Sequence, residues 1–202
     1  GQIAYDELVL ATGSVPRRLP EAIGGALDGV FTVRDLADVD AMAPRFVKGA
    51  KVLIVGGGYI GLEAAAVARK RGREVTLIDA SPRILGRVAA PETADFFREL
   101  HRANGVDIRE GVGLDRLTGD GQVTGAVLSD GTEIAVDMVI AGIGITPNGG
   151  PAVLAGVTLD NGIATDIQGR TSDLNIWAAG DVTGRDQFVY MAAYGAKLAA
   201  KN

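Results

Sequence analysis

Two segments rich in Val, Leu and Ile stand in the central part of the chain. Residues 51–55 form an apolar run without polar alternation, which is typical of a parallel strand covered on both faces, and residues 74–79 are interpreted as a second buried strand. Residues 59–71 between them are good helix formers, and Gly72 is suited to end the helix. A strand, a helix and a strand in about 30 residues make a βαβ unit. The pattern therefore predicts an α/β fold with a Rossmann-like unit.

A second helix is expected after this unit. Pro91 suits the first helical position, and the helix should run to Asn104. Its spacing places Phe97, Leu100 and Ala103 on the inner side.

The remaining pattern is mainly of short β segments. Short β runs between residues 112 and 140, separated by glycine turns, predict an antiparallel meander that returns to a buried strand at residues 138–141. A hairpin-like section is expected over residues 152–171. Residues 8–11 and 176–179 read as buried strands, and residues 188–201 as a helix.

Composition excludes several classes of function. The net charge of −5 argues against a nucleic-acid or anionic-membrane partner, because both need a basic face. The absence of cysteine and the single histidine argue against a metal site, and no catalytic acid or base is predicted. No apolar run approaches the ~20 residues that span a bilayer. A cytoplasmic location is expected.

The strongest motif follows the first apolar strand. Gly56-x-Gly58-x-x-Gly61 lies between a predicted strand and a predicted helix, the context that dinucleotide binding requires. The first glycine allows a tight turn, the second lets a pyrophosphate approach the main chain, and the third lets helix and strand pack closely. The helix N-terminus offers free amides to phosphates. A glycine-rich turn without a ligand is the alternative interpretation.

Asp79 favours the dinucleotide-binding interpretation and indicates which nucleotide is bound. It ends the second strand, where a carboxylate can accept hydrogen bonds from both adenosine ribose hydroxyls and would repel the 2′-phosphate of NADPH. NADH is therefore the expected nucleotide, and Arg83 and Arg87 are interpreted as solvated loop residues. Glu63, expected in the first helical turn, is by itself better explained by the helix dipole than by contact with a ligand. His101 is expected at the surface, and Trp177 and the tyrosines in packing positions.

Three segments together resemble a known family. The family is that of the FAD-dependent pyridine nucleotide-disulfide oxidoreductases. Residues 5–16 resemble the motif that leads out of its flavin domain, and residues 55–63 resemble its NAD fingerprint. Residues 176–182 are similar to the motif by which the chain returns to the flavin. Residues 84–91 and 97–107 resemble the NADH-dependent ferredoxin reductases of the putidaredoxin, rhodocoxin and rubredoxin reductase type. Residues 187–197 resemble the mercuric and disulfide reductase branch instead.

The resemblance implies an activity and a set of binding residues. The whole enzyme would pass electrons from NADH through FAD to a ferredoxin-type iron–sulfur protein. Asp181 would bind the ribityl chain of FAD, with Gly180 beside it and Thr12 and Gly13 passing close to the flavin. The NADH contacts implied are with Gly56, Gly57, Gly58, Tyr59, Ile60, Gly61, Glu63, Asp79, Gly142 and Gly144.

The resemblance also implies a division of the chain. Residues 43–148 would form the NAD(H)-binding domain, and residues 1–42 and 149–202 would be partial FAD-binding segments. The family's first GxGxxG and its C-terminal domain are not in the sequence, so we expect a fragment that is colourless, inactive alone and prone to self-association. A fragment of a disulfide or mercuric reductase and an inactive NADH-binding module remain as alternatives.

Overall fold

Two compact units make up the chain, and the larger is built on a parallel sheet. The computed structural model describes residues 3–201. One unit comprises Pro16–Gly144, and the other comprises Gly1–Val15 with Ile145–Asn202. The sheet of the larger unit has the strand order β3-β10-β4-β5-β6, with all neighbours parallel. Its strands are β3 (Val30–Phe31), β4 (Lys51–Val55), β5 (Glu74–Asp79), β6 (Val106–Glu110) and β10 (Met138–Ala141).

The strand order reverses between β4 and β10. From β4 the chain adds β5 and then β6 on one side, and β10 then pairs with the other side of β4. In open α/β sheets ligands bind outside the carboxyl ends of the strands at such a reversal. The expected glycine motif begins at this point, directly after β4.

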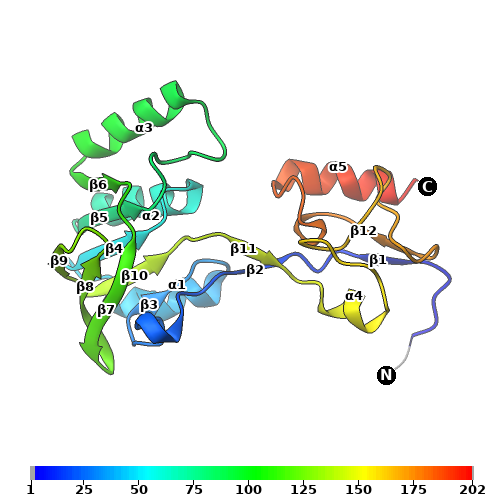
Figure 1. The fold of residues 1–202 in the computed structure, drawn as a ribbon, viewed down its shortest axis with the longest axis horizontal. Helices are drawn as coiled ribbons and strands as arrows, with labels where there is room; N and C mark the ends of the chain where they lie inside the picture. Colours follow the sequence, from blue (N-terminus) through cyan, green and yellow to red (C-terminus); the bar gives the residue numbers. More distant parts are fainter. Residues whose placement is uncertain (1–2, 202) are drawn as a thin grey trace. The chain divides into compact units, whose positions relative to one another are not determined.

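The two faces of this sheet pack against different layers (Figure 1). Val52 and Ile54 of β4 face a core shared with helices α2 (Tyr59–Lys70) and α3 (Pro91–Ala103). Leu53 of β4 faces a second core. This core is shared with an antiparallel sheet of β7 (Leu114–Asp120), β8 (Gln122–Leu128) and β9 (Glu133–Ala135). Each fully buried Leu or Ile side chain stabilises the fold by about 1.5–3 kcal/mol, so both layers hold the sheet firmly.

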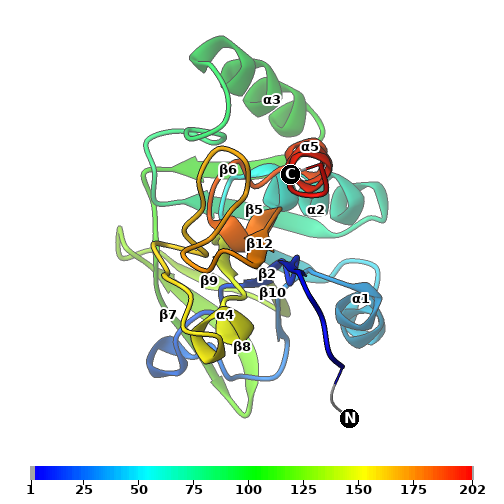
Figure 2. The same ribbon diagram turned by 90° about the vertical axis from the view of Figure 1, so that its right-hand side faces the viewer.

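The smaller unit contains a two-stranded parallel sheet. Strand β1 (Leu8–Leu10) pairs with β12 (Ile176–Ala178), and helix α5 (Val189–Ala199) packs against β12 (Figure 2, where α5 is seen end-on). A second small sheet pairs β2 (Ser14–Pro16) with β11 (Ile145–Pro147).

The remaining elements of the whole chain are short helices. They are η1 (Glu21–Ile23), α1 (Leu36–Met42), η2 (Ala43–Arg45), α4 (Gly150–Leu154) and η3 (Asp181–Thr183).

Several sequence predictions are confirmed, and two local ones are wrong. The α/β class, the βαβ unit and the antiparallel meander are present. The hairpin expected over residues 152–171 is wrong: its start belongs to α4, and only an isolated bridge joins Leu159 to Ile163. The inner face of α3 agrees with the prediction only in part. Phe97 packs against the core as predicted, but Ala103 is exposed and Leu100 is 44% exposed, whereas Ala94 and His101 are buried.

The compact units do not coincide with the expected segments. Residues 16–42, expected with the flavin segment, belong to the larger unit, because β3 pairs with β10. Among residues 3–201, no helix combines the length and the apolar character needed to cross a bilayer.

Candidate dinucleotide-binding site

Gly56 and Gly61 bring the phosphate loop close to two other pieces of backbone. Gly56 has φ +111°, a conformation that favours glycine, and a Cβ there would lie 2.3 Å from the Gly142 carbonyl oxygen. A Cβ at Gly61 would lie 2.0 Å from the Gly56 carbonyl oxygen. Gly56 therefore makes the tight turn and Gly61 the close packing of helix on strand, as the motif predicts.

Gly58 differs from these two glycines. It is the N-cap of α2, its φ of −80° suits any residue, and a Cβ there would meet nothing within 4 Å. The open volume lies beside the first turn of α2, whose amides have no intrahelical acceptor. The first two helical residues, Tyr59 and Ile60, are 49% and 44% exposed. This arrangement leaves space for an anionic group at the helix N-terminus.

The Asp79 carboxylate is held in place at the end of β5. Its Oδ2 accepts a hydrogen bond from the Gly57 amide at 2.7 Å, and its Oδ1 accepts one from the Ser81 amide at 2.7 Å. An ionised carboxylate offers about four acceptor positions, so two remain for a diol. The Gly57 amide is engaged by Asp79, which leaves the amides after it to face a phosphate.

Three further candidate residues are Gly142, Gly144 and Glu63. A Cβ at Gly142 would be 3.5 Å from the Gly61 nitrogen, so this backbone lies directly beside the loop. Gly144 has φ +101°. Glu63 is exposed, but it lies in the second turn of α2 and not the first, since no acidic residue stands in the first turn. The helix-dipole explanation of Glu63 is therefore weakened.

Within the smaller unit, the residues expected near the flavin lie together. The Ser14 hydroxyl donates to Asp181 Oδ2 at 2.9 Å, and Ser14 is only 5% exposed. The Thr12 hydroxyl donates to the Asn148 carbonyl at 2.7 Å, and the Asn148 amide donates to the Gly13 carbonyl at 2.9 Å. Ser14 was not among the predicted site residues, although its position next to Thr12-Gly13 could have suggested it.

Gly180 precedes this aspartate in a backbone conformation that favours glycine. Its φ is +82°, and a Cβ there would lie 3.3 Å from the Cβ of Ala192 in α5. The residue therefore sets the direction in which the chain enters η3, where Asp181 is the first residue.

Two predictions about other side chains need correction. His101, expected at the surface, is 8% exposed. Its Nδ1 lies 2.9 Å from the Phe97 carbonyl oxygen and its Nε2 lies 3.1 Å from that of Leu62, so the ring joins α3 to α2. Trp177 is buried as expected, but the four tyrosines are 49–64% exposed.

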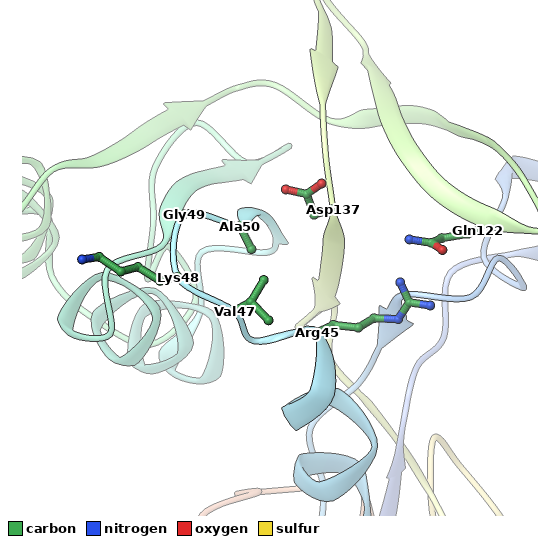
Figure 3. Close-up of a pocket in the computed structure, with 7 residues that line it drawn as sticks. All are labelled: Arg45, Val47, Lys48, Gly49, Ala50, Gln122 and Asp137. Carbon is green, nitrogen blue, oxygen red and sulfur yellow. The ribbon is translucent and has the colours of Figure 1, made fainter.

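One hollow of the larger unit lies away from this site (Figure 3). It encloses about 390 Å³ and is lined by residues that precede β4 and β10, among them Ala50 and Asp137. It therefore lies at the amino edge of the sheet, opposite Gly56. Asp137 accepts a hydrogen bond from the Lys51 amide, and Arg45 is paired with Asp28. We place the candidate site at the carboxyl edge, because the open helix N-terminus and the carboxylate are there.

Among residues 3–201, no cluster of three or more metal-ligating side chains is placed to hold an ion.

The parallel sheet, its strand-order reversal and the glycine loop define a Rossmann-type dinucleotide-binding protein. The chain belongs to the pyridine nucleotide-disulphide oxidoreductase family, whose model matches residues 1–199.

The relatives that the chain matches are longer than the chain itself. The chain is 47% identical over 187 residues to the 5,5′-dehydrodivanillate O-demethylase ferredoxin reductase subunit of Sphingobium sp., covering 92% of this chain and 45% of that protein. It is 44% identical to putidaredoxin reductase of Pseudomonas putida. That match covers 88% of this chain and 43% of the relative. Among solved structures, the crystal structure of a covalent putidaredoxin reductase–putidaredoxin complex matches with a TM-score of 0.83 and 42% identity. That match covers 88% of this chain and 44% of the chain in the complex. The chain thus spans about half the length of the curated relatives it matches.

Proposed function

We propose that the larger unit binds NADH at the carboxyl ends of β4 and β5. The observation that carries this proposal is the open volume at Gly58, beside the N-terminus of α2 and near a carboxylate with free acceptor positions. The pyrophosphate would meet the amides of Tyr59 and Ile60, and Asp79 would accept from the adenosine ribose. Glu63, Gly142 and Gly144 would line the nicotinamide half.

The smaller unit is proposed to contribute to FAD binding. The Ser14 hydroxyl donates to Asp181 Oδ2 and so orients a carboxylate, the kind of group to which hydroxyls of a ribityl chain donate. Thr12, Gly13 and Gly180 would lie along the flavin. When bound, FAD supplies the chemistry that turns a hydride donor into a source of single electrons. The residues of this chain bind and orient the cofactors, and none is proposed as a catalytic acid or base.

The acceptor proposed for the whole protein is a ferredoxin-type iron–sulfur protein. Support comes from the relatives, of which one is a ferredoxin reductase subunit and another is seen joined to putidaredoxin. The disulfide-reductase alternative rests only on the resemblance of residues 187–197.

The nucleotide preference tests the proposed NADH site. We expect NADH to bind more tightly than NADPH by about 5- to 150-fold, which corresponds to about 1–3 kcal/mol, because Asp79 accepts from a diol and repels a phosphate. Isothermal titration of both nucleotides into the wild type measures this ratio, and Asp79→Asn should reduce it.

The matched control is Asp137→Asn. The Asp137 carboxylate also accepts a backbone amide at 2.7 Å, but it lies at the opposite edge of the sheet. This variant should keep the wild-type ratio. Equal affinities of the wild type for NADH and NADPH would overturn the assignment of Asp79 to the ribose.

A further inference from the structure

The segment between β5 and α3 is fastened to the phosphate loop. The Leu85 amide donates to the Gly57 carbonyl at 2.9 Å. From the other side, the Gly57 amide donates to Asp79. The Ile84 side chain lies so close that a Cβ at Gly57 would be 2.6 Å from its Cγ2. The position of Gly57 therefore depends on the position of residues 84 and 85.

This segment holds a backbone conformation that needs support. Leu85 has φ +54° although it is not a glycine, and it is 3% exposed. A bulky residue rarely adopts this left-handed conformation, and such residues persist only where the surroundings hold them. The neighbouring Ile84 amide supplies one such restraint, because it donates to Oε1 of Glu110 at 2.8 Å.

Glu110 is itself held by a two-pronged ion pair. Nε of Arg98 lies 2.6 Å from Glu110 Oε2, and Nη2 lies 2.8 Å from Oε1. The two side chains are 18% and 14% exposed, so solvent screens the pair only partly. Burial raises the pKa of Glu110, but hydrogen bonds from Arg98 and Ile84 outweigh it, and the pKa lies below its usual range. Glu110 is therefore ionised at neutral pH, with its oxygens directed at Arg98 and Ile84.

We propose that Glu110 is a positioning residue for nucleotide binding. Through the Ile84 amide it fixes the turn at Leu85 against Gly57, and this keeps Gly57 and Asp79 in the geometry that receives the adenosine half of the nucleotide. Arg98 holds the Glu110 carboxylate in the required direction. The inference rests on the proposed NADH site and adds to it a support that touches no part of the ligand.

Removal of this carboxylate should weaken binding of the nucleotide. In Glu110→Ala the Ile84 amide loses its acceptor, and we expect the dissociation constants of NADH and of ADP-ribose to rise by about 3- to 30-fold. ADP-ribose lacks the nicotinamide, so an equal loss for both probes places the effect on the adenosine half. Glu110→Gln keeps an acceptor for Ile84 and should bind more tightly than Glu110→Ala. Asp107→Asn is the matched control, since it removes an ion pair with Arg109 on the same strand without touching the segment.

Amide hydrogen exchange separates positioning from general destabilisation. In Glu110→Ala, exchange at Leu85 should accelerate, while exchange at Leu53 in the centre of β4 should stay at the wild-type rate. Unchanged affinity in Glu110→Ala, or equal affinities of the Ala and Gln variants, would overturn the positioning role. If the wild type binds neither probe, the proposed NADH site fails instead. The exchange at Leu85 still decides whether Glu110 fixes the turn.

Discussion

Gly58→Val is expected to abolish NADH binding while the fold stays intact. The valine side chain would occupy the open volume beside the first turn of α2, where the pyrophosphate must approach the backbone. We expect the dissociation constant to rise by about 1,000-fold or more, equivalent to about 4 kcal/mol. The fold should survive, because a Cβ at this position meets no protein atom within 4 Å. Titration with NADH and circular dichroism measure the two effects.

Gly150→Val is the control for this substitution. Gly150 also has nothing within 4 Å of an added Cβ, but it belongs to the smaller unit. This variant should bind NADH as the wild type does. NADH binding by a natively folded Gly58→Val protein at the wild-type affinity would show that the phosphate loop lies elsewhere.

Gly61→Ala should destabilise the larger unit strongly. Helix propensity alone predicts that Gly→Ala inside a helix stabilises by about 1 kcal/mol. Here the added Cβ would lie 2.0 Å from the Gly56 carbonyl oxygen, which belongs to backbone that cannot move aside without disrupting the β4–α2 turn. We expect a net loss of about 2–4 kcal/mol.

Urea unfolding followed by circular dichroism tests whether Gly61→Ala lowers the free energy of unfolding. Gly58→Ala is the matched control, because it lies three residues earlier in open space. Its unfolding midpoint should stay near that of the wild type. A Gly61→Ala protein as stable as the wild type would contradict the close packing of α2 on β4.

The parts of the fold that could be predicted depend on local signals. Residues 51–55 form an apolar run that glycines follow, and residues 74–79 contain a second group of Val, Leu and Ile, so the βαβ unit and its phosphate loop can be predicted from sequence. Gly121 and Gly131 have φ of +69° and +84°, as the turns of the predicted meander require.

The errors arise where distant contacts decide the structure. Leu100 and His101 are neighbours in α3, and the histidine is buried where a ring N–H can donate to a backbone carbonyl, that of Phe97 or that of Leu62. Helix periodicity cannot predict this, since it treats histidine as polar. Strand β3 joins the parallel sheet only by pairing with β10, more than 100 residues later.

The residues that hold the candidate site residues in place also could not be predicted from local sequence patterns. Ser14 and Asp181 are separated by 167 positions, and their hydrogen bond depends on the pairing of β1 with β12. Glu110 and Arg98 look like ordinary surface charges in sequence. Only the structure shows that Glu110 accepts hydrogen bonds from both Arg98 and the Ile84 amide.

The location of the bound nucleotide tests the central claim most directly. Titration of ¹⁵N-labelled protein with NADH, followed by amide chemical shifts, reports which residues the nucleotide approaches. We predict that the largest shift changes occur at Gly58, Tyr59 and Ile60, with further changes at Asp79. Shift changes concentrated instead at Gly49, Ala50 and the other residues lining the hollow at the amino edge of the sheet would contradict the account (Figure 3).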